Sequence, residues 1–171
     1  FFNTIPHKER KLTPIQYNGS RYYVAKGSAK KRLKSAKLLA QLETMKLSLC
    51  KQLENSRYKS DPGVRRLLSK RKVRIEERSS SYAEEIAYSV NKGEFIGICL
   101  ESEDINTAFF VLLHELAHIM SKKYDHDSEF WTNFKLLIKA ADEFGIYKYV
   151  SYNKQPTSFC GTKISHMPYK K

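Results

Sequence analysis

The sequence predicts an α+β fold, in which a short and mostly antiparallel sheet packs with one buried helix and a following packing helix. Three observations carry this prediction. Residues 87–100 have the pattern of two strands joined by a turn, residues 109–120 are mostly apolar, and residues 128–144 repeat apolar side chains at helical spacing. A chain of 171 residues that is 41% hydrophobic can bury one core, so we expect one compact domain at 81–171 and a basic, mainly helical extension at 1–80.

The amino-terminal extension carries the positive charge of the chain. Residues 1–80 hold 21 lysines and arginines against 6 acidic residues, whereas residues 81–171 hold 10 against 12. A basic cluster lies at the start of an expected helix that ends near Asn55, and its members are Lys30, Lys31, Arg32 and Lys34. Such a cluster can contact the phosphates of nucleic acid or anionic lipid head groups, and it can also be a solvated helix face.

An apolar stripe follows on the same expected helix, at Leu38, Leu42, Met45 and Leu49. Because these side chains recur at steps of four and three residues, they lie on one face. We therefore expect the helix to pack on its own domain, with a flexible joint at 78–81 before the compact part.

Two strands are expected before the buried helix, at 87–90 and 94–100, with the turn at 91–93. Ile96 and Ile98 alternate with Phe95 and Gly97, so both faces of the second strand are apolar. A strand of this kind is covered on both sides, and its glycine marks a close approach of another group.

The buried helix carries the pattern H-E-L-A-H at 114–118. Residues four apart share a helix face, so His114 and His118 can bind one metal ion, while Glu115 is rotated beside it and can accept a proton from a metal-bound water. Asp104 or Asn106 is expected to cap this helix. The alternative interpretation is a hydrogen-bonded pair of core histidines.

A third ligand is expected from His126, because the polar residues after the buried helix should end it and return the chain toward the metal. Glu129 and Glu143 are the alternative third ligands, as carboxylates. Asp127 or Ser128 suits the cap of the next helix, and Asp127 can orient His126. Three histidines leave one coordination position open, which favours a catalytic zinc over a structural one.

At this point the chain resembles a family. H-E-L-A-H, a polar spacer and H-D-x-x-F-W are similar to the compact zinc peptidases of the WLM and SprT-like kind, and more similar to an uncharacterised branch in large DNA viruses. The resemblance runs from about Tyr82 through the segment at 159–161 and departs from the WLM pattern in its longer spacer, at 122–124.

The resemblance implies a zincin-like domain that hydrolyses peptide bonds, with one Zn²⁺ held by His114, His118 and His126 and with Glu115 as the general base. It also implies an extended substrate held along a strand, for which Ile96, Gly97 and Ile98 are the candidates if they lie at a sheet edge. Repair of DNA, known for WLM and SprT-like proteins, is only an association here.

The tail and the cysteines give weaker predictions. Residues 146–152 alternate as a strand does, and each of their three tyrosines could donate to an oxyanion. Cys50, Cys99 and Cys160 are odd in number and widely spaced, which favours a reducing intracellular compartment over a disulfide framework. Cys160 is expected to be a buried apolar side chain rather than an additional metal ligand.

Two further functions compete with a peptidase that acts as a monomer on a protein or peptide. One is a non-catalytic, zinc-stabilised module that binds nucleic acid or an anionic membrane through its basic half. The other is a zinc hydrolase that acts on a non-peptide bond in a small closed pocket. Because the sequence starts at Phe1 and Phe2 without a Met, we expect that a segment upstream is missing, and the resemblance to the viral sequences implies a membrane anchor there. No long apolar segment is present in 1–171.

Overall fold

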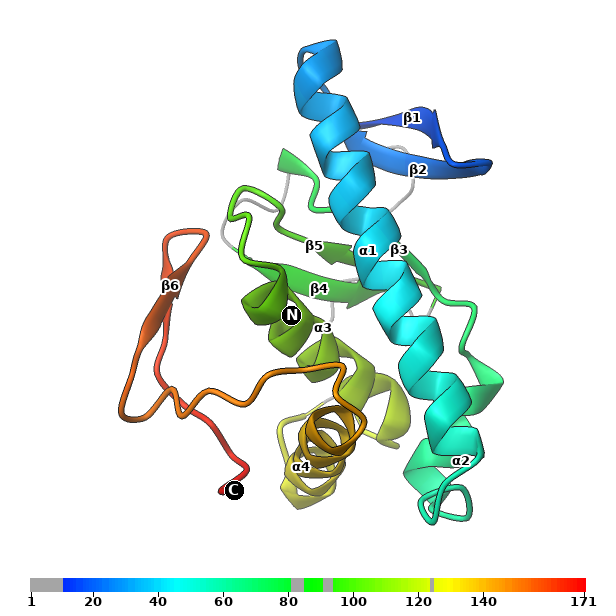
Figure 1. Cartoon of the computed structure of the whole chain (residues 1–171), viewed down its shortest axis with the longest axis vertical. Coiled ribbons are helices and arrows are strands. Elements are labelled where there is room, and N and C mark those ends of the chain that lie inside the picture. Colours follow the sequence, from blue (N-terminus) through cyan, green and yellow to red (C-terminus); the bar gives the residue numbers. More distant parts are fainter. Residues whose placement is uncertain (1–10, 81–84, 91–93, 124) are drawn as a thin grey trace.

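The computed structural model describes residues 11–80, 85–90, 94–123 and 125–171, and these confirm the α+β prediction. The elements are β1 (Leu12–Tyr17), β2 (Ser20–Ala25), α1 (Ala29–Glu54), α2 (Pro62–Ser69), β3 (Arg74–Glu77), β4 (Ala87–Val90), β5 (Phe95–Ile98), α3 (Ile105–Met120), α4 (Ser128–Glu143), β6 (Thr157–Phe159) and β7 (Thr162–Ile164). In the view of Figure 1, α3 and α4 lie between the long helix α1 and the hairpin of β6 and β7. The expected turn at 91–93 and residues Phe1 and Phe2 lie outside the described residues.

The central sheet has the strand order β3-β5-β4. β4 and β5 form the expected antiparallel pair, but β3 pairs with β5 in parallel, so this sheet is mixed. The hairpins β1–β2 and β6–β7 are antiparallel. Because β5 is paired on both sides, the proposed role of Ile96, Gly97 and Ile98 as a substrate edge strand is wrong: its backbone donors and acceptors face β3 and β4.

Gly97 is required by a close approach, as its position in an apolar strand predicted. A Cβ atom at Gly97 would lie 2.3 Å from Cζ of Tyr88, the cross-strand partner on β4. The Tyr88 hydroxyl accepts a hydrogen bond of 3.0 Å from the Ser79 amide. The glycine therefore makes room for a ring that ties β4 to the chain after β3.

Helix α1 packs on the core of its own domain, as expected. Its N-cap Ser28 accepts a hydrogen bond of 3.1 Å from the Lys31 amide. Leu42 and Leu49 of the predicted stripe are fully buried in one apolar cluster with α3 and α4, and Leu38 and Met45 are partly buried against it. The same face also buries Lys46, whose Nζ donates to the Val73 carbonyl at 2.6 Å.

The boundary expected at residue 80 falls between strands of one sheet. β3, on the amino-terminal side, pairs with β5 on the other side. Ser79, in the expected flexible joint, is fully buried, and its Oγ accepts from the Lys11 amide at 3.1 Å. The division into two parts stays a prediction, but at Ser79 the chain is packed rather than linker-like.

The amino-terminal region contains a hairpin that the mainly helical prediction omitted. β1 and β2 are joined by Asn18 and Gly19, with φ of 47° and 79°. Asn-Gly is the strongest short-range hairpin signal because a type I′ turn needs positive φ at both positions. The signal was therefore present in the sequence.

The tail does not form the strand expected at 146–152. Gly145, with φ of 73°, follows the end of α4, and the chain then runs without regular structure to β6. Tyr147 and Tyr152 are buried there instead, and the Tyr147 hydroxyl donates to the Tyr152 hydroxyl at 3.1 Å. Packing against the core replaces strand pairing in this segment.

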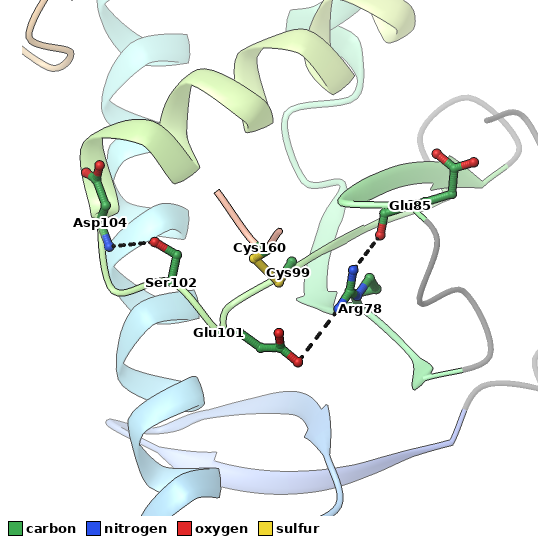
Figure 2. The surroundings of a disulfide bond; sticks show 7 residues. All are labelled: Arg78, Glu85, Cys99, Glu101, Ser102, Asp104 and Cys160. Atoms are coloured by element: carbon green, nitrogen blue, oxygen red, sulfur yellow. Dashed lines mark hydrogen bonds and ion pairs between the residues drawn. A yellow bond between two sulfur atoms is a disulfide. The ribbon is translucent and has the colours of Figure 1, made fainter. Parts of the chain in front are cut away.

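The cysteine prediction needs correction. Cys99, after β5, forms a disulfide with Cys160, between β6 and β7, and their Cα atoms are 6.5 Å apart (Figure 2). Cys50 is a buried free thiol. The intracellular compartment stays a prediction, but the cysteine pattern no longer supports it. Among the helices of the described ranges, none combines the length and the apolar character needed to cross a bilayer.

Candidate metal centre

Helix α3 places the first two candidate ligands. It is almost entirely buried, and Asp104 caps it by accepting a hydrogen bond of 3.1 Å from the Thr107 amide, as expected for one of the two proposed caps. His114 and His118 lie one turn apart, with their ring centres 5.1 Å apart. His118 is fully buried, whereas the His114 side chain is 23% exposed. The helix thus places the imidazole of His118 in the core and leaves that of His114 partly accessible to solvent.

His126 joins the pair from the loop between α3 and α4. Its Nε2 lies 3.1 Å from Nε2 of His118, and its ring centre is 5.1 Å from that of His114. One nitrogen from each of the three histidines lies within 4.8 Å of the others. The structure therefore brings together the three ligands that the sequence predicted.

The three imidazoles fit a metal ion such as zinc. Two nitrogens bound tetrahedrally at about 2.0–2.1 Å lie about 3.3 Å apart, close to the separation of the two Nε2 atoms of His118 and His126. Partial burial of the His126 ring, followed by the charge of His114, lowers the pKa of His126 and favours the neutral form that binds metal. The same nitrogen separation also suits a hydrogen bond between the two rings, which is the alternative that the sequence left open.

Glu115 lies beside His114 in a buried position, with 1% of the residue exposed. Its Oε2 is 3.0 Å from Nδ1 of His114. Because a carboxylate oxygen only accepts, Nδ1 carries the proton in this contact and leaves Nε2 of His114 available as a ligand atom. Glu115 Oε1 is also buried, and no described residue forms a hydrogen bond with it. A buried carboxylate oxygen in this state is costly unless a ligand or water completes it.

Phe130 of α4 packs against all three imidazoles. Its ring centre is 4.4 Å from that of His118, 4.6 Å from that of His126 and 5.1 Å from that of His114. Phe130 itself is fully buried. The Phe of the H-D-x-x-F-W element thus contacts all three candidate ligands.

Arg66 of α2 holds the ends of the loop that carries His126. Its Nε donates to the Met120 carbonyl at the end of α3 at 2.6 Å, and its NH2 donates to Glu129 in the first turn of α4 at 3.1 Å. The second oxygen of Glu129 accepts from the Lys122 amide at 2.8 Å. Glu129 is thus used to close the loop, and it does not belong to the ligand group. No sequence signal separated Arg66 from the other basic residues of its region.

The remaining alternatives lie elsewhere. Glu143 accepts hydrogen bonds from Arg57 at 2.8 Å and from Tyr58 at 3.2 Å, and it is not part of the ligand group. Asp127, one of the two proposed caps, caps α4 by accepting from the Phe130 amide at 3.0 Å. Its proposed orientation of His126 stays a prediction.

A cavity of about 320 Å³ opens beside His114 and Glu115. Its lining also includes Trp131 of α4 and residues 163–166 of the carboxyl-terminal segment. His166, unassigned from the sequence, stands edge to face with Trp131, with ring centres 5.4 Å apart. The long separation of this segment from H-E-L-A-H left no spacing signal by which to find it.

The tyrosines proposed as oxyanion donors are placed in other contacts. Besides the buried pair of Tyr147 and Tyr152, the Tyr149 hydroxyl donates to the Tyr169 carbonyl at 2.9 Å. None of the three lines the cavity beside Glu115. The oxyanion hypothesis for these residues therefore has no support in the geometry.

The basic residues divide into two groups. At the start of α1, Lys30, Lys31 and Lys34 are exposed, and Lys34 forms an ion pair with Glu103. The second group extends from α2 to β3. In it, Arg71 forms an ion pair with Glu54 and Arg74 forms one with Glu76, in addition to the contacts of Arg66 on α2. Part of the positive charge is therefore used within the fold. Arg32 belongs to the first group, at the start of α1, but is partly buried.

Comparison with known proteins links the chain to a viral protein. It is 38% identical over 84 residues to an uncharacterised protein of Acanthamoeba polyphaga mimivirus. The aligned region covers 46% of this chain and 43% of the mimivirus protein, so the chain spans less than half the length of that relative. No family model matches the chain, and no solved structure matches it.

Proposed function

We propose that this chain is a zinc-dependent metallopeptidase with a zincin-like domain of the WLM and SprT-like kind, in which His114, His118 and His126 hold one Zn²⁺. One observation carries the proposal: three imidazole nitrogens lie within 4.8 Å of one another, and one of these imidazoles, that of His114, contacts the buried carboxylate of Glu115. Imidazole is a common zinc ligand, and three protein ligands are typical of catalytic rather than structural zinc.

The residues around the metal divide the work of hydrolysis. Bound zinc supplies a Lewis acid that lowers the pKa of a water to about 7 and polarises a substrate carbonyl. Glu115 accepts a proton from the attacking water and returns it to the leaving amine. His114 holds Oε2 of Glu115 at 3.0 Å, which leaves Oε1 for the water. Phe130 excludes water from one side of the imidazoles because its fully buried ring covers them.

The test compares two glutamate variants in the zinc-loaded protein. Glu115→Gln should bind one zinc and cleave an unfolded protein substrate about 10²- to 10⁴-fold more slowly, because it removes a general base. Glu143→Gln is the matched control, since Glu143 contacts Arg57 and Tyr58 away from the site, and it should keep wild-type activity. Wild-type rates in zinc-loaded Glu115→Gln would refute the proposal.

A non-catalytic module that binds polyanions is the second candidate. It is favoured by Lys30 and Lys31, which are exposed and form no ion pair with any described residue. Binding should weaken steeply with salt if phosphates are contacted. Titration of labelled duplex DNA and of anionic lipid vesicles would test the two partners separately. A protein that binds either, with affinity reduced in Lys30→Glu/Lys31→Glu, and that cleaves no peptide would favour this candidate over the peptidase.

A further inference from the structure

The cavity beside Glu115 is largely apolar. One wall of the cavity, on α3 and α4, is formed by Phe110, Val111 and Phe134, each no more than 5% exposed. Ala87 of β4 and the preceding Ile86 contribute further apolar surface. Because His114 and Glu115 line the same space, whatever occupies it lies next to the reacting groups.

The wall on α3 and α4 is fixed by aromatic packing. The ring of Phe110 lies 5.3 Å from that of Phe134 and 4.7 Å from that of Tyr152. Phe134 in turn stands edge to face with His114 at 5.3 Å. The cavity surface formed by Phe110 and Phe134 is therefore in direct contact with His114, one of the proposed zinc ligands.

A second wall comes from Lys163, Ile164, Ser165 and His166. This segment is attached on both sides. The disulfide of Cys160 precedes it, and the Met167 amide after it donates to Asn153 Oδ1 at 2.8 Å.

Polar groups come from the same wall and from the chain before β4. Lys163 and His166 can donate hydrogen bonds to peptide carbonyl oxygens, whereas Glu85 adds negative charge. The carbonyl of Glu85 is held by Arg78 at 2.8 Å, which Figure 2 shows. The cavity therefore combines an apolar interior with a few convergent polar groups, as ligand sites do.

Resting on the proposed peptidase function, we infer that this cavity receives a large apolar side chain, aromatic or branched aliphatic, from a residue that flanks the cleaved peptide bond. A cavity of about 150 Å³ accommodates a benzene molecule in another protein, so the space of about 320 Å³ here accepts a phenylalanine or leucine side chain. Burial of such a side chain favours it over alanine, and a carboxylate there would lose its hydration.

The first experiment measures binding without cleavage. Trp131 is the sole tryptophan of the chain and lines the cavity, so its fluorescence reports on occupancy. Zinc-loaded Glu115→Gln is titrated with short peptides that differ at one position, which is Phe, Leu, Ala or Asp. The Phe and Leu peptides should bind at least about tenfold more tightly than the Ala and Asp peptides. Equal affinities across the series would overturn the inference.

The second experiment changes the selectivity of cleavage. Ile164→Asp places a carboxylate in the wall, and it should reduce the preference for Phe and raise that for Lys at the same peptide position. Thr162→Asp is the matched control, because Thr162 lies on the same strand, is exposed and does not line the cavity. If Ile164→Asp does not fold, Ile164→Ala provides the test and should weaken binding of the Phe peptide.

The outcomes separate the inference from the function on which it rests. Preferential binding of Phe and Leu peptides, with no cleavage by the wild-type protein, would retain the cavity assignment and remove the peptidase. Cleavage by the wild type without any preference at the tested positions would retain the peptidase and overturn the cavity assignment. Unchanged preference in a folded Ile164→Asp protein would also overturn it.

Discussion

The two walls of the cavity are built in different ways. The wall from α3 and α4 arises from two neighbouring helices. It includes His114 and Glu115, and Phe130, which packs against His114, comes from the same short stretch of sequence. The wall at 163–166 comes from a distant segment that a disulfide spanning 61 residues joins to the end of β5. The first wall carries the residues proposed to bind metal and transfer protons, and we expect the second to affect what binds in the cavity more than whether metal binds.

Truncation of Phe130 should produce the largest effect. Phe130→Ala removes a fully buried ring that contacts three imidazoles, so we expect a loss of about 3–5 kcal/mol in the free energy of unfolding, together with weaker zinc binding. Urea unfolding and zinc titration measure the two effects. A stable variant with unchanged zinc affinity would show that the ring does not orient the histidines.

Removal of the disulfide should distinguish the roles of the two walls. Cys160→Ser should lower the free energy of unfolding by about 2–4 kcal/mol, because it frees a long loop in the unfolded chain. Zinc stoichiometry should remain at the wild-type value, while discrimination between Phe and Ala peptides falls. A loss of zinc in folded Cys160→Ser would contradict the division of roles between the walls.

Arg66 tests whether the loop that carries His126 is held from outside. Arg66→Ala removes the contacts to the Met120 carbonyl and Glu129, and the zinc affinity should fall about 10- to 100-fold, as for outer residues that support metal ligands. The neighbouring Arg65 is exposed, so Arg65→Ala is the matched control. Arg66→Lys should give an intermediate affinity, because lysine cannot reproduce the two-nitrogen contact. Equal affinities in the Arg65 and Arg66 variants would exclude the positioning role.

Cys50 should show the smallest effect. Burial, as the largest cause, raises the pKa of its thiol, so the reactive thiolate forms only above the usual pH range. Labelling of the native protein with a thiol reagent at neutral pH should therefore be slow, and it should become fast on unfolding. Rapid labelling of the folded protein at neutral pH would place this thiol at the surface instead.

The sequence predicted those features that depend on local spacing. The helices at α3 and α4, the antiparallel pair of β4 and β5, and the convergence of His126 with the two helical histidines all follow from residues close in the chain. The β1–β2 hairpin also had a local signal, at Asn18 and Gly19, which the prediction of a mainly helical extension did not use.

Features that depend on distant residues were not predictable from one sequence. The parallel pairing of β3 placed β5 in the centre of the sheet and removed its proposed edge role. The pairing of Cys99 with Cys160 depends on the path of the tail, whose tyrosines pack in the core instead of forming a strand. Likewise, only the packing of α2 distinguishes Arg66 from the other arginines nearby.

The most direct test of the metal centre is the zinc content of the purified protein and two histidine variants. His126→Ala removes a proposed ligand, whereas His166→Ala removes a histidine that lines the cavity beside His114 but is not one of the three clustered histidines. After equal exposure to zinc and removal of excess metal, the wild type and His166→Ala should each retain one zinc per chain, and His126→Ala should retain much less. Full zinc content and unchanged affinity in His126→Ala would contradict the three-histidine site.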